Sequence, residues 1–461
     1  MSKTFDAIVI GAGQAGPSLA ARLAAAGMTV AIAERHLVGG TCVNTGCMPT
    51  KTMVASAYAA HLARRSADFG VAIAGGITVD MKRVHARAAT VTRDARSGLE
   101  SWLSGMERCT LIRGHARFVG PHEVEIDGET LTAAKIFINV GGRAAVPDMP
   151  GIDRITYLTN TGMVALDHVP EHLVVIGGSY VGIEFGQMFR RFGAKVTIVE
   201  TAPRLVSRED PDISAAIRDI LESEGIAVRV DAKCIGFEPR DGSVQVNVDC
   251  RSGEPAALGS HVLLAVGRRP NTDDLGLAEA GIEVDGRSFI KVDDGLATTA
   301  DGVWALGECN GRGAFTHTAY NDFEIVAANL LDGDCRRVGD RVPGYALFID
   351  PPLGRVGLSE TEAKKSGREV LVGSRPMTRV GRAVEKGETQ GFMKIIADPE
   401  TGRILGAAIL GPGGDEAIHG VLDAINAGMT YRQLQWAVPI HPTVSELIPT
   451  VIGDMKRSQG D

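Results

Sequence analysis

Residues 6–34 read DAIVIGAGQAGPSLAARLAAAGMTVAIAE, and this stretch decides the fold. A short apolar strand, Asp6 to Ile10, enters a glycine turn that opens an alanine-rich helix through about Ala26. A second strand, Thr29 to Ala33, then ends at Glu34. Strand, glycine turn, helix, strand and acid in this order are typical of the βαβ unit that binds a dinucleotide.

The glycines of the turn GAGQAG each meet a physical need. Gly11 permits the tight turn, Gly13 lets the backbone approach a pyrophosphate, and Gly16 lets helix and strand pack closely. The N–H groups at the start of the helix face the phosphates, and Glu34 accepts hydrogen bonds from the hydroxyls of the adenosine ribose. A lone GxGxxG turn often arises by chance, so the prediction depends on the strand, helix and acid around it.

The same order returns at residues 173–200, LVVIGGSYVGIEFGQMFRRFGAKVTIVE. Its turn contains Gly177, Gly178 and Gly182, and Ser179 stands where the first copy has its middle glycine. The second strand again ends in an acid. This repeat predicts a second nucleotide site.

The acid of the second copy, Glu200, bears on which nicotinamide nucleotide binds. A carboxylate there accepts hydrogen bonds from a ribose 2′-hydroxyl and repels a 2′-phosphate, which favours NADH. Arg204 and Arg208 follow closely and could neutralise a phosphate, so NADPH stays as the less favoured alternative.

Length and composition indicate a multidomain globular enzyme. At 461 residues with 44% hydrophobic residues, the chain is too long for one ordinary core. Its 48 basic and 56 acidic residues give a net charge of -8 without a basic block, so neither nucleic acid nor a membrane surface is an expected partner. The N-terminus lacks the pattern of a signal peptide, and no apolar run is long enough to span a bilayer. We therefore expect a cytoplasmic protein.

The sequence between and after the two units suggests how the chain is divided. We expect helices from Lys51 to about Arg65 and from about Met81 to Leu103, and strands that run to Ile138. Residues 298–308, TTADGVWALGE, read as a turn, a strand and an acid that return to the first domain. The predicted divisions are 1–150 and 272–341 for the first nucleotide domain, 151–271 for the second, and 342–461, with strands Gly391–Ile396 and Ile404–Leu410, for a dimer-forming domain.

Two of the seven cysteines lie in the segment GGTCVNTGCMPTK, residues 39–51. In a regular helix the five residues from Cys42 to Cys47 rise about 7.5 Å, beyond the roughly 4.4 to 6.8 Å between Cα atoms in a disulfide. A bond between them therefore needs a distorted turn, which Gly46 and Pro49 are suited to make. The functional interpretation is a dithiol that exchanges with a disulfide substrate.

Two simpler interpretations of this pair are buried thiols and half of a zinc site. Zinc sites usually have ligands two to four residues apart and a second ligand pair, and no such pair lies nearby. No metal site is therefore expected. The other cysteines stand alone and are expected to be small buried hydrophobic residues. They are Cys109, Cys234, Cys250, Cys309 and Cys335.

The chain resembles the pyridine nucleotide-disulfide oxidoreductases, the group of dihydrolipoamide dehydrogenase, glutathione reductase and mercuric reductase. The motifs GAGQAG, GGTCVNTGCMPTK, GGSYVGIE, VGRRPN, TTADGVWALGE and HPTVSE occur in family order over nearly the whole chain. The resemblance implies an α/β fold with two Rossmann-like domains and a C-terminal α+β dimerisation domain. It implies FAD on the first βαβ unit, a nicotinamide nucleotide on the second, and a homodimer.

The resemblance also implies roles for single residues. Lys51 and Glu184 match an ion pair beside the flavin, and Cys47 matches the flavin-proximal thiol, with Cys42 as the thiol that meets the substrate. His441 and Glu446 match the acid-base pair that each subunit lends to its neighbour's dithiol. The chemistry needs such a pair, because releasing a thiolate requires a proton donor that titrates near neutral pH. Tyr180 matches either a ring that gates the nicotinamide pocket or a packing aromatic. Further candidate cofactor-binding residues are Thr41, Gly142, Gly267 and Glu308.

Two departures from the family pattern bear on this reasoning. The family usually has Gly-Asp where this chain has Gly307-Glu308, a position that bonds the ribityl chain of FAD. Mercuric reductases typically carry a vicinal cysteine pair near the C-terminus, and this chain ends GDMKRSQGD. Yet SREDPDI and MTRVGRAVEKGETQGF look more like mercuric-reductase-type members than like the other two groups.

Three functions remain open from the sequence. The leading one is an NADH-dependent reductase of a small disulfide such as lipoamide. The alternative is a mercuric-reductase-like enzyme that reduces a soft metal ion, because soft thiolates suit soft metals. The third is a subunit of a 2-oxoacid dehydrogenase whose main role is to dock on a core protein.

Overall fold

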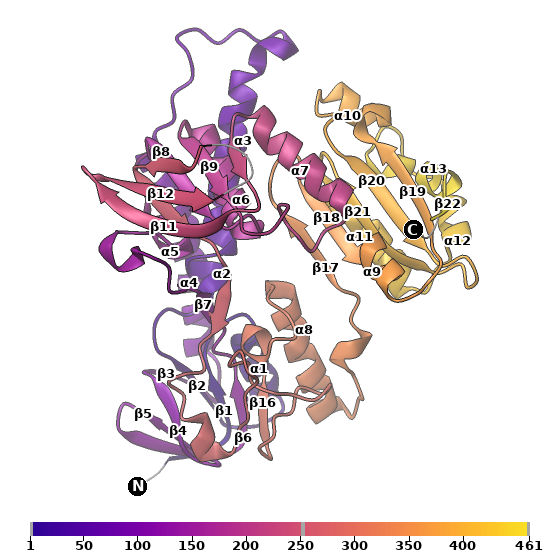
Figure 1. The fold of residues 1–461 in the computed structure, drawn as a ribbon. Coiled ribbons are helices and arrows are strands. Elements are labelled where there is room, and N and C mark those ends of the chain that lie inside the picture. Colours follow the sequence, from indigo (N-terminus) through magenta and orange to yellow (C-terminus); the bar gives the residue numbers. More distant parts are fainter. Residues whose placement is uncertain (1–2, 250–253, 459–461) are drawn as a thin grey trace.

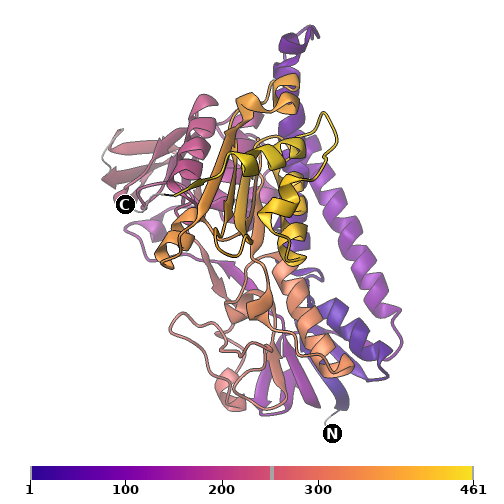
Figure 2. The same ribbon diagram turned by 90° about the vertical axis from the view of Figure 1, so that its right-hand side faces the viewer.

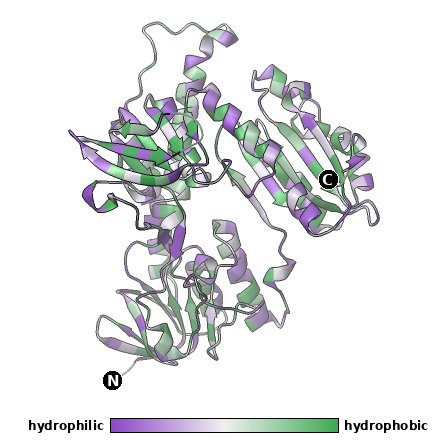
Figure 3. Ribbon diagram, in the orientation of Figure 1, coloured by the Kyte–Doolittle hydropathy of each residue, from purple (hydrophilic) through white to green (hydrophobic). Residues whose placement is uncertain are grey.

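The computed structural model of the chain describes residues 3–249 and 254–458 (Figure 1). Within these residues the strands form sheets of seven, six, four, three and two strands. Helices pack on the larger sheets, and Figure 3 shows apolar residues along the strands of these sheets. The predicted α/β fold is thus confirmed.

The first sheet carries the first glycine turn. Its order is β3-β2-β1-β6-β5-β4, with β16 paired to β6. Residues 7–10 of β1 are all buried, as expected for a parallel strand covered on both faces. Its strands are β1 (Lys3–Ile10), β2 (Val30–Glu34), β3 (Cys109–Arg113), β4 (Ala116–Gly120), β5 (Glu123–Ile126), β6 (Glu129–Ile138) and β16 (Val303–Ala305). Helices α1 (Gly16–Ala25) and α8 (Thr316–Ala327) pack against each other beside it.

Two long helices follow the cysteine segment. Helix α3 (Cys47–Arg64) begins at Cys47 and not at Lys51 as predicted, because Pro49 is tolerated in a first helical turn, where its missing N–H is not needed. Helix α4 (Met81–Ser104) agrees with the prediction, and its N-cap Asp80 accepts a hydrogen bond from the N–H of Arg83 at 3.2 Å. Figure 2 shows α4 as the long helix along one side of the molecule.

The second unit repeats the first on a smaller scale. Its parallel sheet has the order β10-β9-β8-β14, and an antiparallel sheet β11-β12-β13 packs beside it. Every residue of β8 is buried. The strands are β8 (His172–Ile176), β9 (Lys195–Val199), β10 (Ala227–Arg229), β11 (Lys233–Arg240), β12 (Ser243–Asp249), β13 (Ala256–Gly259) and β14 (His261–Leu264), and the helices are α6 (Tyr180–Phe192) and α7 (Pro211–Ser223).

The C-terminal part forms an antiparallel sheet of the order β17-β18-β21-β20-β19-β22, coloured orange to yellow in Figure 1. The predicted strand Gly391–Ile396 lies one residue further on, because Gly391 takes a left-handed φ of 90° before the strand begins. The elements are β17 (Gly344–Leu347), β18 (Leu353–Gly357), β19 (Leu371–Pro376), β20 (Phe392–Ala397), β21 (Ile404–Leu410), β22 (Lys456–Arg457), α11 (Gly414–Asn426) and α13 (Ile448–Gly453).

Two short strands join the first and second units. β7 (Gly142–Ala144) leads out of the first sheet, β15 (Arg268–Pro270) leads back, and they pair antiparallel. The chain then returns to the first sheet, where β16 pairs with β6. The pattern of residues 298–308 predicts this return. The predicted divisions at 150, 271 and 341 stay predictions.

The lone cysteines differ from the expectation. Cys309 is buried, whereas Cys234 and Cys335 are exposed and Cys109 is half-buried. Cys234 lies on an outer strand, β11, and Cys335 in a loop, so neither position is covered by another layer. Cys250 lies outside the described residues. Among the helices that the structure describes, none is both long and apolar enough to cross a membrane.

Candidate active site

The three glycines of the first turn stand where a Cβ would crowd a neighbouring atom. Gly11 has a φ of 102°, and a Cβ there would lie 2.4 Å from the carbonyl oxygen of Asn139. A Cβ on Gly16 would lie 2.3 Å from the carbonyl oxygen of Gly11, and one on Gly13 would lie 3.0 Å from Asn139 Oδ1. This bare turn at the start of α1 fits the pyrophosphate of a dinucleotide such as FAD.

The second turn is built in the same way. Gly177 has a φ of 114°, and a Cβ on Gly182 would lie 2.0 Å from the carbonyl oxygen of Gly177. A Cβ on Gly178 would meet Leu205 at 2.5 Å. Ser179 has an extended φ of -111° as the N-cap of α6, a conformation open to any residue. The serine therefore introduces no backbone strain at this position.

The two acids take equivalent positions in the two units. Glu34 accepts hydrogen bonds from the N–H groups of Ala12 at 2.9 Å and His36 at 2.8 Å. Glu200 accepts them from Gly178 at 2.6 Å and Ala202 at 2.7 Å. Each carboxylate is thereby fixed beside its glycine turn, and it keeps further lone pairs for other donors.

Asn139 holds the first glycine turn in place through hydrogen bonds of its side chain. The sequence reasoning did not identify this residue. It is 6% exposed. Its Oδ1 accepts a hydrogen bond from the N–H of Gly16, and its Nδ2 donates to the carbonyl oxygen of Leu306, each at 3.0 Å. The available signal was a polar residue that directly follows a buried strand and precedes two glycines.

Glu308, the departure from the usual aspartate, makes a two-point ion pair with Arg268. The distances from Nε to Oε1 and from Nη2 to Oε2 are 2.6 and 3.0 Å. The carboxylate also lies against Gly142, where a Cβ would be 2.8 Å from Oε2. Gly267 has a φ of 123° just before the arginine. The longer side chain of Glu308 thus reaches the guanidinium group of Arg268. The sequence reasoning did not identify this ion pair.

The segment between the two site cysteines is broken, as the spacing predicts. Helix α2 (Gly40–Asn44) carries Cys42, and α3 starts at Cys47. Between them, a Cβ on Gly46 would lie 2.8 Å from the carbonyl oxygen of Thr41. Both cysteines are free thiols in this structure. The break places Cys47 at the first position of an 18-residue helix, where a negative charge is stabilised.

The two thiols titrate as a pair. The pKa of Cys47 is lowered to about 5, chiefly because Cys42 donates a hydrogen bond to its sulfur. The hydroxyl of Thr316, at 3.4 Å, and the positive charge of Lys51 lower it further. The same hydrogen bond, together with burial, raises the pKa of Cys42. At neutral pH the pair therefore shares one proton and carries one negative charge, which the contacts of Cys47 with Thr316 and Lys51 stabilise.

Lys51 and Glu184 form an ion pair of 2.7 Å between α3 and α6. The Glu184 side chain is 7% exposed and also accepts a hydrogen bond from the N–H of Phe348 at 2.9 Å. The Lys51 ammonium lies 4.6 Å from the centre of the Phe348 ring. A cation is thus held beside the dithiol by contacts from both nucleotide units and the C-terminal part.

Tyr180 lies in a group of aromatic rings. Its ring stands edge-on to Tyr345 at 5.3 Å and to Phe315 at 6.0 Å between centroids. Burial raises the pKa of Tyr180 to about 12. The contacts fit a packing aromatic, and its position within the second glycine turn, at the first residue of α6, also fits a gate, so both interpretations stay open.

His441 lies on an exposed loop. Its Nδ1 is 2.8 Å from Glu446 Oε2, and its side chain is 81% exposed. Trp436, Val438 and Ile440, just before it, are 85%, 95% and 78% exposed. Such an apolar patch next to a preoriented imidazole is typical of a surface that a partner covers.

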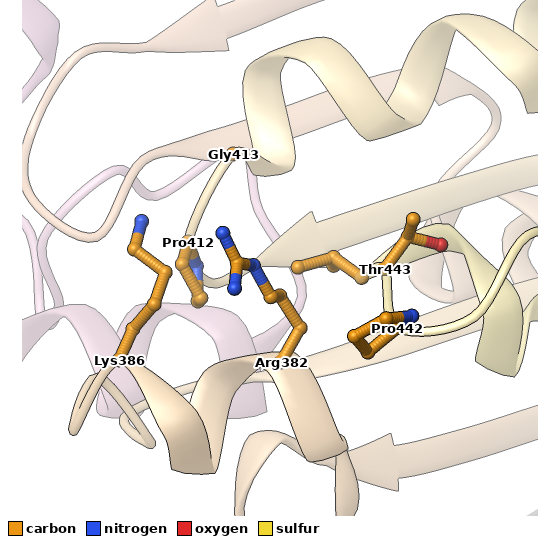
Figure 4. A pocket seen from close by; sticks show the side chains of 7 residues that line it. Arg382, Lys386, Pro412, Gly413, Pro442 and Thr443 are labelled. Atoms are coloured by element: carbon orange, nitrogen blue, oxygen red, sulfur yellow. The ribbon is translucent and has the colours of Figure 1, made fainter.

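A pocket opens beside this loop (Figure 4). Two cations point into it, but Arg382 is already paired with Glu385 at 3.1 Å and Lys386 with Glu388 at 3.2 Å. Each cation thus already has a carboxylate partner on its own segment. It is lined by Arg382, Lys386, Pro412, Gly413, Pro442, Thr443 and Val444.

Comparisons with known proteins identify the family of the chain. The family model of the pyridine nucleotide-disulphide oxidoreductases matches residues 5–322, and the model of their dimerisation domain matches residues 343–452. A probable pyridine nucleotide-disulfide oxidoreductase of Escherichia coli, RclA, is 37% identical over 96% of this chain and 97% of its own length.

Two further relatives represent other activities. A dihydrolipoyl dehydrogenase of Thermus scotoductus is 34% identical over 96% of both chains. A mercuric reductase of Bacillus cereus is 32% identical over 96% of this chain and 70% of its own. The solved structure of the HOCl-induced flavoprotein disulfide reductase RclA from Escherichia coli matches with a TM-score of 0.87 and 35% identity over 97% of this chain and 99% of that one. This chain is thus an enzyme of the pyridine nucleotide-disulfide oxidoreductase family.

Proposed function

We propose that the enzyme reduces a small disulfide with electrons from NADH, through FAD and the cysteines Cys42 and Cys47. The observation that carries this proposal is the coupled dithiol at the start of α3, where the pKa of Cys47 is about 5 and that of Cys42 is raised. Such a pair separates a stable thiolate from a protonated thiol, which a structural cysteine pair does not need.

The first glycine turn and Glu34 would hold FAD, since Gly11, Gly13 and Gly16 bring the backbone close at positions where a Cβ would crowd a neighbour. When bound, FAD supplies hydride acceptance from the nicotinamide and delivery of two electrons to the disulfide. The chain's own contribution is positioning and charge. Lys51, held by Glu184, keeps a positive charge beside the Cys47 thiolate.

The exchange with substrate uses both sulfurs and an imidazole. Cys42 gives its proton to His441 of the second copy in the dimer and attacks the substrate disulfide, whose S–S bond breaks. The leaving sulfur takes the proton back from His441 and departs as a thiol. Cys47 then attacks the Cys42 sulfur, the second half of the substrate leaves and takes a proton from solvent, and the Cys42–Cys47 disulfide forms again. Each cycle consumes one NADH and one proton and releases two thiols.

The proposed preference for NADH is supported by Glu200. Its carboxylate is fixed beside the second turn by two backbone N–H groups, so it cannot easily move away from a 2′-phosphate. Arg204 donates to the backbone carbonyls of Ser207 and Glu209, which directs it toward its own loop. Comparing kcat/KM for the two nucleotides tests this preference.

Reduction of a soft or borderline metal ion is the second candidate function. It is favoured by the solved Cu(II) complex of RclA, which matches with a TM-score of 0.88 and 35% identity, and by the mercuric reductases among the relatives. A thiolate and a thiol side by side are suitable ligands for such an ion. Turnover of Cu(II) or Hg(II) salts with NADH, together with failure on lipoamide and other small disulfides, would favour this function.

The test of the shared mechanism is an anaerobic titration of the purified holoenzyme with NADH, followed by visible absorbance. We expect a long-wavelength charge-transfer band that appears on reduction in the wild type, is present before NADH is added in Cys42→Ser, and is absent in Cys47→Ser. Cys335→Ser is the matched control, because Cys335 is an exposed cysteine in a loop outside the site segment. Plain loss of flavin colour in all variants would mean that the dithiol does not communicate with FAD.

A further inference from the structure

Phe348 lies between two core residues but does not share their surroundings. Leu347, the last residue of β17, is 0% exposed and Ile349 is 3% exposed, and both belong to the apolar core around α6 and the second parallel sheet. Phe348 itself is half-buried. Its ring faces α3, where the ring centre lies 4.6 Å from Lys51 Nζ.

The backbone that carries this ring is bound along one face of α6. The N–H of Phe348 donates to Glu184 Oε1 at 2.9 Å. The N–H and the carbonyl oxygen of Asp350 pair with the side-chain amide of Gln187 at 2.8 and 2.9 Å, and the Asp350 carboxylate makes an ion pair of 2.6 Å with Arg191. The three α6 residues are three and four positions apart, so they form one row on the helix. The backbone on both sides of the ring is therefore fixed.

The Lys51 ammonium has the ring on one side and a carboxylate on another. Glu184 binds Lys51 Nζ through Oε2 at 2.7 Å and the N–H of Phe348 through Oε1, so one buried carboxylate joins both residues. A cation is attracted to the face of an aromatic ring, more strongly where water is excluded. The Lys51 side chain is 33% exposed, so the ring replaces part of the water that would surround the ammonium.

Lys51 acts on the dithiol through its charge. It follows Cys47 by four residues on α3, which places both on one face of the helix. The pKa of Cys47 is lowered chiefly by the hydrogen bond from Cys42, and the positive charge of Lys51 contributes to the same effect. Such a charge stabilises a thiolate best when it is fixed in place and poorly screened by water. The contact with Phe348 serves both needs.

We propose that Phe348 is a positioning residue of the redox site, whose ring holds the Lys51 ammonium beside Cys47 and shields one side of it from water. The inference rests on the dithiol function proposed above and adds to it a contribution from the C-terminal part of the chain. The role requires an aromatic ring. A residue that only packs would be replaced equally well by another apolar side chain of similar size.

The test is the pH dependence of Cys47 alkylation in holoenzyme reduced by a phosphine, which is removed before labelling. We expect Phe348→Leu to move the midpoint to higher pH by about half a unit, because a more mobile and more hydrated Lys51 stabilises the thiolate less. Phe348→Met, a second apolar replacement, should move it in the same direction, whereas Phe348→Tyr keeps the ring and should keep the wild-type midpoint. Phe392→Leu is the matched control, because Phe392 is another half-buried ring of the C-terminal part and packs on the apolar core.

A second background shows whether the ring acts through the ammonium. In Lys51→Gln the charge is gone, so adding Phe348→Leu should leave the midpoint where Lys51→Gln alone places it. An equal shift by Phe348→Leu in both backgrounds, or wild-type midpoints in both Phe348→Leu and Phe348→Met, would overturn the proposal. Because the phosphine replaces NADH, the midpoints do not depend on hydride transfer. The proposed function fails by a different result, the absence of a charge-transfer band when the wild type is titrated with NADH.

Discussion

The pKa of Cys47 in the reduced enzyme is the most direct physical consequence of the site. An ordinary cysteine titrates near pH 8.5, whereas the pKa of Cys47 is lowered to about 5, with the hydrogen bond from Cys42 as the largest cause. Since the thiolate and not the thiol is alkylated, the rate of alkylation should rise with pH around pH 5. It should then stay level through neutral pH.

Replacing Cys42 by alanine removes the donor, and the size of the effect can be worked out. A hydrogen bond to a charged group is worth about 1.5–3 kcal/mol, and about 1.4 kcal/mol corresponds to one pH unit in a pKa. We therefore expect the pKa of Cys47 to rise to about 6–7 in Cys42→Ala, where Thr316, Lys51 and the start of α3 still act. Cys42→Ser keeps a hydroxyl donor and should stay closer to the wild type.

The assay is iodoacetamide labelling of NADH-reduced holoenzyme under anaerobic conditions, with the peptide that contains Cys47 quantified by mass spectrometry. The exposed Cys335 provides an internal reference for an ordinary thiol in the same samples. A wild-type midpoint near pH 8.5, or the same midpoint in Cys42→Ala as in the wild type, would refute the argument that Cys42 stabilises the thiolate.

Three other predictions concern the scaffold and the partner surface. Asn139→Ala removes the acceptor of the Gly16 N–H, at a cost of about 1–3 kcal/mol, while the carbonyl of Leu306 keeps the Cys309 thiol as a donor; we expect a lower urea midpoint and weaker retention of FAD, and Asn139→Asp, which keeps the acceptor, should lose less. Glu200→Gln removes the charge that repels a 2′-phosphate, so the ratio of kcat/KM for NADH over NADPH should fall, and an unchanged ratio would count against its role. Val438 is 95% exposed, and Val438→Asp should weaken the dimer, which sedimentation at several concentrations would measure.

The repeated βαβ units were predictable because their pattern is local. Each glycine turn joins two strands within about thirty residues, and steric contacts inside the unit impose the glycines, as the 2.3 Å approach of a Gly16 Cβ to Gly11 shows. The strand Ile404–Leu410 has the predicted limits. The predicted start of α3 at Lys51 was wrong. Pro49 was taken as a residue that breaks the helix, whereas a proline is tolerated in a first helical turn.

The residues that the sequence did not reveal act across long separations. Asn139 contacts Gly16, Arg268 contacts Glu308, and Thr316 contacts Cys47, each from another part of the chain. No periodic pattern or spacing marks such contacts, because they depend on how whole units pack. The prediction that the lone cysteines are buried was wrong at Cys234 and Cys335 for a similar reason. Whether a residue is buried depends on what packs over it and not on its type.

The pairing of β16 with β6 has a consequence for how the protein is made. The C-terminal end of β6, residues 136–138, pairs with β16, which follows the whole second unit in the chain. During synthesis the ribosome therefore releases the second unit before the strand that completes the first sheet. The unpaired end of β6 must stay protected over that interval. A chaperone requirement that ends once residue 305 has emerged would be the cellular sign of this order.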